Sequence, residues 1–202
     1  ILEKEINFFD VHNILGNLKF WIKTNDNFKL INVERNPIDL TYSWYKNKFG
    51  TFSKSSINQV LVYDFKGNIV PAYAKNWAKD YVKMVELDRI IRIINQETEN
   101  SEKYYKYYKK KGSILRIKYE EILYKPIENL ALVSNFLKLK SKIHFNKYKK
   151  NITKKHSLSP EKRRRKLVEE RKKKLNFIKS KCTKKYYTKL INLTNVYDPE
   201  SL

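Results

Sequence analysis

Cysteine, histidine and long apolar runs are all scarce in this chain of 202 residues. The single cysteine, Cys182, excludes an internal disulfide framework and a zinc site built on cysteines. His12, His144 and His156 are scattered, so we expect no structural metal site. No run of about 18 apolar residues occurs, which argues against a transmembrane helix. The first ten residues do not resemble a signal peptide, and together these features predict a cytoplasmic location.

Glycine is scarce as well, with only Gly16, Gly50, Gly67 and Gly112 in the whole chain. Each lies near an expected boundary between elements, as turn and cap residues do. The pattern Gly-x-x-x-x-Gly-Lys-Ser/Thr, which cradles nucleotide phosphates in P-loop enzymes, does not occur. This argues against a kinase of the P-loop type.

Positive charge is abundant, and the formal net charge is +23. Residues 142–189 carry 20 Lys or Arg against 3 Glu, so the excess is concentrated toward the C-terminus. Such a balance is compatible with a polyanion partner, and a basic nucleic-acid-binding protein without catalysis is one open alternative. Lys outnumbers Arg by 36 to 8. A low-GC genome produces this excess of lysine whatever the function of the protein. No recognised nucleic-acid-binding module is present, and we expect no specific nucleic-acid partner.

Strand and helix patterns alternate along the chain, which predicts an α/β domain with a parallel sheet flanked by helices. We expect residues 142–202 to form a basic loop and helices that complete the same domain as residues 1–141. Residues 97–111 are expected to form a polar stretch and residues 141–158 a loop. The expected strands are 6–12, 28–33 and 113–119, a hairpin turn is expected at 64–67, and the expected helices are 14–23, 36–50, 72–96, 126–137, a basic helix from 160, and 183–196.

The segment Lys29 to Tyr45 has the pattern of an anion site. Arg35 follows a mostly apolar strand, and ligands of open α/β sheets bind at that edge. Asn36 and Pro37 are suited to begin a helix, whose free N–H groups we expect to face an anion. Ser43 adds a hydroxyl eight residues after Arg35. From the residues alone, an ion pair of Arg35 and a packing role for Ser43 are equally open.

The same residues, RNPIDLTYSWY, resemble the 3′-phosphate motif of sulfotransferases that use 3′-phosphoadenosine 5′-phosphosulfate (PAPS). In that family the Arg and the Ser hold the 3′-phosphate, which implies this role for Arg35 and Ser43. The resemblance also implies a P-loop nucleotide-hydrolase-like sulfotransferase fold. His12 would be the general base that deprotonates an acceptor hydroxyl, and the alternative is a capping histidine. Tyr119, at the end of a second strand resembling the family's, would lie near the adenine or be an ordinary strand-end residue.

The resemblance covers roughly residues 5–140, and beyond them the chain departs from the family. The family's C-terminal basic motif is missing, and Lys162–Lys166 (KRRRK) lies in a plausible place to replace it. Arg163 and Arg164 would then close over the nucleotide phosphates, and the alternative is a solvated helix face. The family's loop for the 5′-phosphosulfate is also missing. The resemblance therefore implies a chain that lacks the first strand and this loop, with little activity of its own.

The activity implied by the resemblance is transfer of a sulfo group from PAPS, without a metal. The acceptor would be a hydroxyl on a small molecule, a lipid or a carbohydrate, and adenosine 3′,5′-bisphosphate would be the other product. The sequence specifies neither the acceptor nor the oligomeric state.

Overall fold

The computed structural model describes residues 28–51, 62–109, 113–139 and 159–198. The strand expected at 6–12, the helix expected at 14–23 and the loop expected at 141–158 lie outside the described residues. The elements, in chain order, are β1 (Leu30–Glu34), α2 (Pro37–Lys46), β2 (Val62–Phe65), β3 (Asn68–Pro71), the 3₁₀ helix η2 (Ala72–Trp77), α4 (Ala78–Tyr81), α5 (Glu86–Lys109), β4 (Ile114–Lys118), α6 (Tyr119–Tyr124), α7 (Pro126–Leu137), α9 (Pro160–Lys179) and α10 (Lys184–Tyr197).

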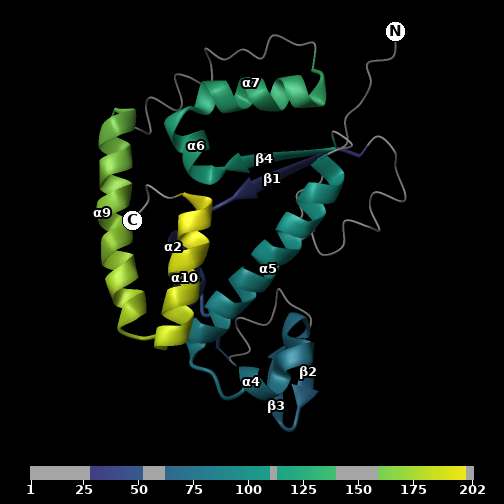
Figure 1. Ribbon diagram of the computed structural model, residues 1–202, viewed down its shortest axis with the longest axis vertical. Coiled ribbons are helices and arrows are strands. Elements are labelled where there is room, and N and C mark those ends of the chain that lie inside the picture. Colours follow the sequence, from purple (N-terminus) through teal and green to yellow (C-terminus); the bar gives the residue numbers. More distant parts are fainter. Residues whose placement is uncertain (1–27, 52–61, 110–112, 140–158, 199–202) are drawn as a thin grey trace.

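Strands β1 and β4 pair in parallel, with Leu30 opposite Ile114 and Glu34 opposite Lys118. Figure 1 shows this pair in the middle of the molecule, with helices around it. A parallel pair requires a long crossover connection, and here the crossover contains α2, the β2–β3 hairpin and α5. The predicted α/β fold, a parallel sheet flanked by helices, is confirmed.

Helix α2 begins as the sequence predicts. The Asn36 side chain accepts a hydrogen bond from the N–H of Ile38 at 3.0 Å, and Pro37 occupies the first helical position. The helix ends at Lys46, before the predicted end at Gly50. Lys48, with φ of 58°, adopts the left-handed conformation after the helix, so the turn does not depend on Gly50.

The hairpin predicted around residues 64–67 is present. Lys66 and Gly67 both have positive φ, 53° and 78°, as the tight turn of a two-residue hairpin requires. The Asp64 carboxylate accepts a hydrogen bond from the N–H of Gly67 at 3.1 Å and closes the turn.

The single helix predicted at 72–96 is wrong, because this region contains η2, α4 and the start of α5. The polar stretch 97–111, which the sequence did not assign to a helix, continues α5 as far as Lys109. Contacts with β4 stabilise this part of α5: Arg116 forms an ion pair with Glu102 at 2.6 Å and lies over the ring of Tyr105. Tertiary packing therefore determines the helix where the local sequence is too polar to predict it.

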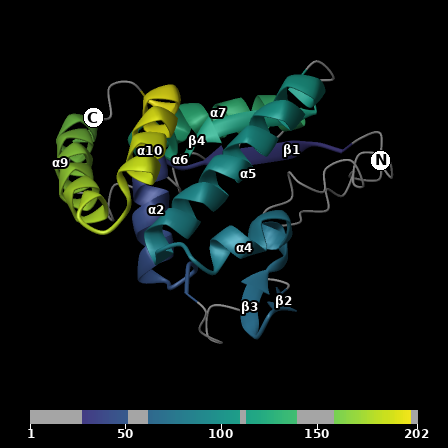
Figure 2. The same ribbon diagram turned by 60° about the horizontal axis from the view of Figure 1, so that its bottom comes forward.

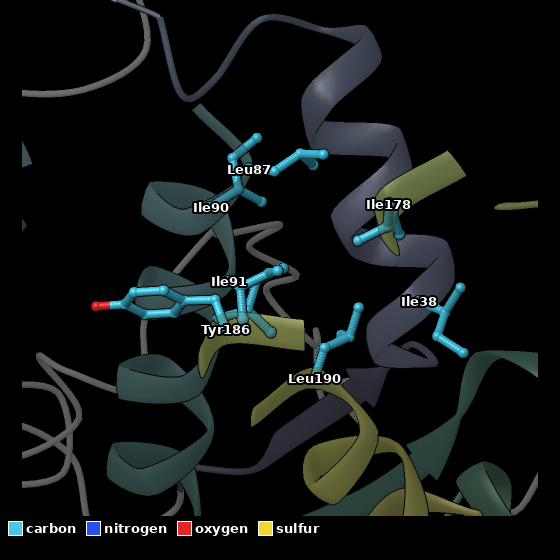
Figure 3. Close-up of a cluster of buried hydrophobic side chains, with 8 residues drawn as sticks. Ile38, Leu87, Ile90, Ile91, Ile178, Tyr186 and Leu190 are labelled. Atoms are coloured by element: carbon cyan, nitrogen blue, oxygen red, sulfur yellow. The ribbon is translucent and has the colours of Figure 1, made fainter. Parts of the chain in front are cut away.

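The main hydrophobic core lies between four helices, and Figure 3 shows its side chains. Helix α5 contributes the largest share, α2 contributes Ile38, and the C-terminal helices contribute Ile178, Tyr186 and Leu190. Figures 1 and 2 both show α9 and α10 side by side, next to α2. The buried members are Ile38, Leu87, Ile90, Ile91, Ile94, Ile178, Tyr186 and Leu190.

Gly50 provides a test of this packing, because a β-carbon there would lie 2.7 Å from the backbone oxygen of Glu86 and 2.9 Å from the Ile90 side chain. We expect Gly50→Ala to lower the free energy of unfolding by about 1–3 kcal/mol in urea denaturation, as overpacking does. Gly67→Asn is the control, since nothing lies within 4 Å of that position and Asn tolerates its positive φ. Equal stability of the two variants would contradict the close packing of Gly50.

Candidate functional site

Arg35 and Tyr119 meet at the carboxyl edge of the parallel pair. Glu34 and Lys118 are partners in the register, so the residues that follow them leave the sheet side by side. The guanidinium carbon of Arg35 lies 5.5 Å from the centroid of the Tyr119 ring, and both side chains are exposed. Within the described residues, Arg35 forms no ion pair with a carboxylate. This corner therefore presents a cation and an aromatic face to solvent, which suits an anion attached to a flat ring.

The amino end of α2 differs from the expectation of free N–H groups. The N–H of Asn36 donates to the Glu120 carboxylate at 3.0 Å, and the N–H of Ile38 donates to the Asn36 side chain at 3.0 Å. Pro37 has no N–H, and that of Leu40 donates to the Asn36 carbonyl. Protein groups therefore satisfy most of the donors that the prediction assigned to an anion. This end of α2 therefore offers an anion the guanidinium of Arg35 rather than a set of free backbone N–H groups.

Ser43 lies on α2, seven residues after Asn36, and therefore about two turns along the same face of the helix. Its side chain is half-buried. Its hydroxyl makes no hydrogen bond with the described part of the chain, in contrast to Thr194, whose hydroxyl donates to the carbonyl one turn earlier. A hydrogen-bonding group is thus available at the position that the resemblance pairs with Arg35.

Asp39, in the first turn of α2, is buried in a pair of charge contacts with α9. Arg171 Nε donates to Asp39 Oδ2 at 2.7 Å, and Lys174 Nζ donates to Oδ1 at 2.6 Å. The side chains of Asp39 and Arg171 are only 4% and 3% exposed. Burial alone would lower the pKa of Arg171. The hydrogen bond to Asp39 and the negative charges of Asp39 and Glu120 outweigh burial, so the pKa is raised and the group stays cationic.

Glu120 continues this network toward the sheet. Arg171 Nη2 forms an ion pair with Glu120 Oε1 at 3.1 Å, and the hydroxyl of Tyr197 donates to Glu120 Oε2. The same hydroxyl lies 3.1 Å from the Glu34 carbonyl oxygen. Burial raises the pKa of Tyr197, and the hydrogen bond to Glu120 raises it further, so this phenol stays protonated. Asp39, Arg171, Glu120 and Tyr197, the buried network, thus connect β1, α2, α6, α9 and α10.

The two arginines expected to close over the nucleotide lie in the first turns of α9. Arg163 Nη1 donates to the Leu123 carbonyl oxygen at 2.8 Å, which fastens α9 to α6 one turn after Tyr119. Arg164 is exposed. The structure therefore brings Arg35 and Tyr119 into contact, and Arg163, on α9, donates to the helix α6 that Tyr119 begins.

His12 lies outside the described residues. Among the residues that are described, no group of three or more His, Cys, Asp or Glu side chains is arranged to hold a metal ion. No helix in those ranges has the length and apolar character needed to cross a membrane.

The sequence did not identify Glu120, Arg171 or Tyr197 as members of this region. Arg171 carried one usable signal: it is an arginine followed by Lys172–Lys174 in a Lys-rich chain. A planar guanidinium suits a buried contact with two carboxylates better than an ammonium group does. Glu120 belongs to the segment Ile114–Glu121, which resembles the strand end of the family, but the sequence assigned it no role. Tyr197 carried no local signal, and the partners of both residues are distant in sequence.

Comparison with known families gives one match: the family model described as "Sulfotransferase domain" matches residues 3–195. No curated protein and no solved structure matches significantly. The matched range includes Arg35, Ser43, Tyr119 and most of the buried network.

The buried network predicts a difference between two neighbouring residues of α9. We expect Arg171→Met to lower the free energy of unfolding by about 3–5 kcal/mol, because it leaves buried carboxylates without their main cation. Lys172→Met, an exposed neighbour that also loses one charge, should change it by less than about 0.5 kcal/mol. Urea denaturation measures the free energy of unfolding of both variants. Equal losses would show that the buried network makes no contribution to stability beyond that of an exposed charge.

Proposed function

Because the chain belongs to the sulfotransferase domain family, we propose that it transfers a sulfo group from PAPS to a hydroxyl-bearing small molecule, lipid or carbohydrate. The observation that supports the donor is the corner of Arg35 and Tyr119. It combines an exposed guanidinium, without a carboxylate partner among the described residues, with an exposed aromatic ring. A nucleotide that carries a phosphate close to its base and ribose suits this combination.

The residues at the corner fit this donor in chemical type. The forked guanidinium of Arg35 can bind two oxygens of the 3′-phosphate. The hydroxyl of Ser43 can donate a further hydrogen bond, and Tyr119 offers its ring or hydroxyl to the adenine. Together, Arg35 and Ser43 would select PAPS over ATP, which lacks a 3′-phosphate.

The chemical step assigns a different role to each remaining residue. When bound, PAPS supplies the sulfo group, and adenosine 3′,5′-bisphosphate remains after its transfer. In our proposal His12 accepts the proton of the acceptor hydroxyl as the new oxygen–sulfur bond forms. Arg163 and Arg164 stabilise negative charge on the nucleotide phosphates, and the contact of Arg163 with α6 supports their location near Tyr119.

We also propose that residues 142–202 complete the same domain as residues 1–141. The support is that α9 and α10 contact α2 and share its hydrophobic core. The buried network supports it further, because Arg171 and Tyr197 bind groups of the first part of the chain.

Isothermal titration calorimetry with adenosine 3′,5′-bisphosphate tests the donor site. We expect Arg35→Ala in the intact protein to weaken binding tenfold or more, because a charge-assisted contact is worth about 1.5–3 kcal/mol. Arg92→Ala is the matched control, since Arg92 pairs with Asp80 of α4 instead. Unchanged affinity in Arg35→Ala would overturn the assignment of the 3′-phosphate site.

A further inference from the structure

We infer that Glu120 is a positioning residue that sets the direction of Arg35 toward the nucleotide, and that α9 and α10 hold Glu120 for this purpose. The inference rests on the proposed function, because it concerns the same 3′-phosphate site. It assigns no contact with the nucleotide to Glu120 itself.

The first step is the bond between Glu120 and the backbone. Glu120 Oε1 accepts from the N–H of Asn36 at 3.0 Å, and this N–H belongs to the peptide group that joins Arg35 to Asn36. Fixing that peptide plane fixes the ψ angle of Arg35 and hence the direction in which its side chain leaves the backbone. Glu120 also directly follows Tyr119, so one carboxylate restrains both halves of the exposed corner.

The second step is that Glu120 is itself fixed. It is buried, with 6% of its surface exposed, and its two oxygens have different partners. Arg171 and the N–H of Asn36 contact Oε1, and Tyr197 contacts Oε2. A carboxylate held from both sides in a dry environment has a single orientation, which is what the support of a binding side chain requires.

The third step is the origin of these restraints. Arg171 lies on α9 and Tyr197 at the end of α10, far along the chain from the Arg35 turn. Arg171 also binds Asp39, in the first turn of α2. The C-terminal helices therefore contact Asp39 directly and the Asn36 N–H through Glu120. The basic C-terminal region would therefore serve the donor site through buried contacts, in addition to any role of its exposed charges.

The experiment compares two ligands, adenosine 3′,5′-bisphosphate and adenosine 5′-phosphate, in the intact protein with Glu120→Gln. The substitution retains the size of the side chain and removes the charge that Arg171 holds. We expect affinity for the bisphosphate to fall about tenfold, as loss of a supporting partner does. Affinity for adenosine 5′-phosphate should change less than twofold, because that ligand has no 3′-phosphate. If the substitution instead disturbed the fold as a whole, the affinity for both ligands would fall by the same factor.

Three further variants make the outcome decisive. Glu121→Gln, an exposed neighbour, should bind both ligands like the original protein. Tyr197→Phe removes only the hydroxyl next to Glu120. Like Glu120→Gln, it should lower the affinity for the bisphosphate relative to that for adenosine 5′-phosphate. This variant provides the test if Glu120→Gln does not fold. In an Arg35→Ala background, Glu120→Gln should change bisphosphate affinity less than twofold, since the two residues act as one unit.

The results separate this inference from the proposed function. If Arg35→Ala weakens bisphosphate binding but Glu120→Gln and Tyr197→Phe leave the affinity ratio unchanged, the positioning role is wrong and the 3′-phosphate site stands. If the Glu120 and Arg35 effects on bisphosphate binding simply add, the positioning role is also wrong. If Arg35→Ala itself has no effect, the proposed function fails first.

Discussion

The contact between Asp39 and Arg171 determines how the C-terminal helices lie against the rest of the chain. Both charged groups are almost fully buried, so each requires the other to offset its lost hydration. A buried pair of this kind adds little stability compared with apolar residues of the same size, but a shifted alignment would leave both charges unpaired. The apolar cluster around Ile38, Ile178 and Leu190 supplies most of the stability, and the pair specifies the alignment of α9 with α2.

That alignment has a consequence for anion recognition at α2. The positive end of a helix is often an anion site because its N–H groups are free and its dipole favours negative charge. Here two carboxylates of the protein itself, Asp39 and Glu120, already lie at this end. They compensate the dipole and occupy the Asn36 donor, so an external phosphate has the guanidinium of Arg35 as its main attraction. In our proposal, recognition of the phosphate depends on the direction of the Arg35 side chain, and the restrained backbone next to Arg35 would set that direction.

The sequence predicted those helices, strands and turns that a few adjacent residues specify. The capped start of α2, the Lys66-Gly67 turn, β4 and α7 each depend on a few adjacent residues, and the structure contains them. The polar half of α5 was not predictable, because Arg116 on β4 stabilises it from outside. Arg35 and Ser43 were found through a motif. The network behind them was not, because no periodicity connects residue 120 with residues 171 and 197.

The distribution of arginine offers a route to such contacts. Lysine is the common basic residue of this chain, and only 8 of its 44 basic residues are arginines. Arg89, Arg116 and Arg171 make buried or half-buried contacts with backbone oxygens, carboxylates or rings, and Arg92 and Arg163 also bind named partners. Arginine here marks positions where a planar, forked donor meets a defined acceptor. Arg35 has an aromatic neighbour, as Arg89, Arg92 and Arg116 do, but no carboxylate partner among the described residues. An acceptor from outside the protein, such as the 3′-phosphate, would complete the pattern.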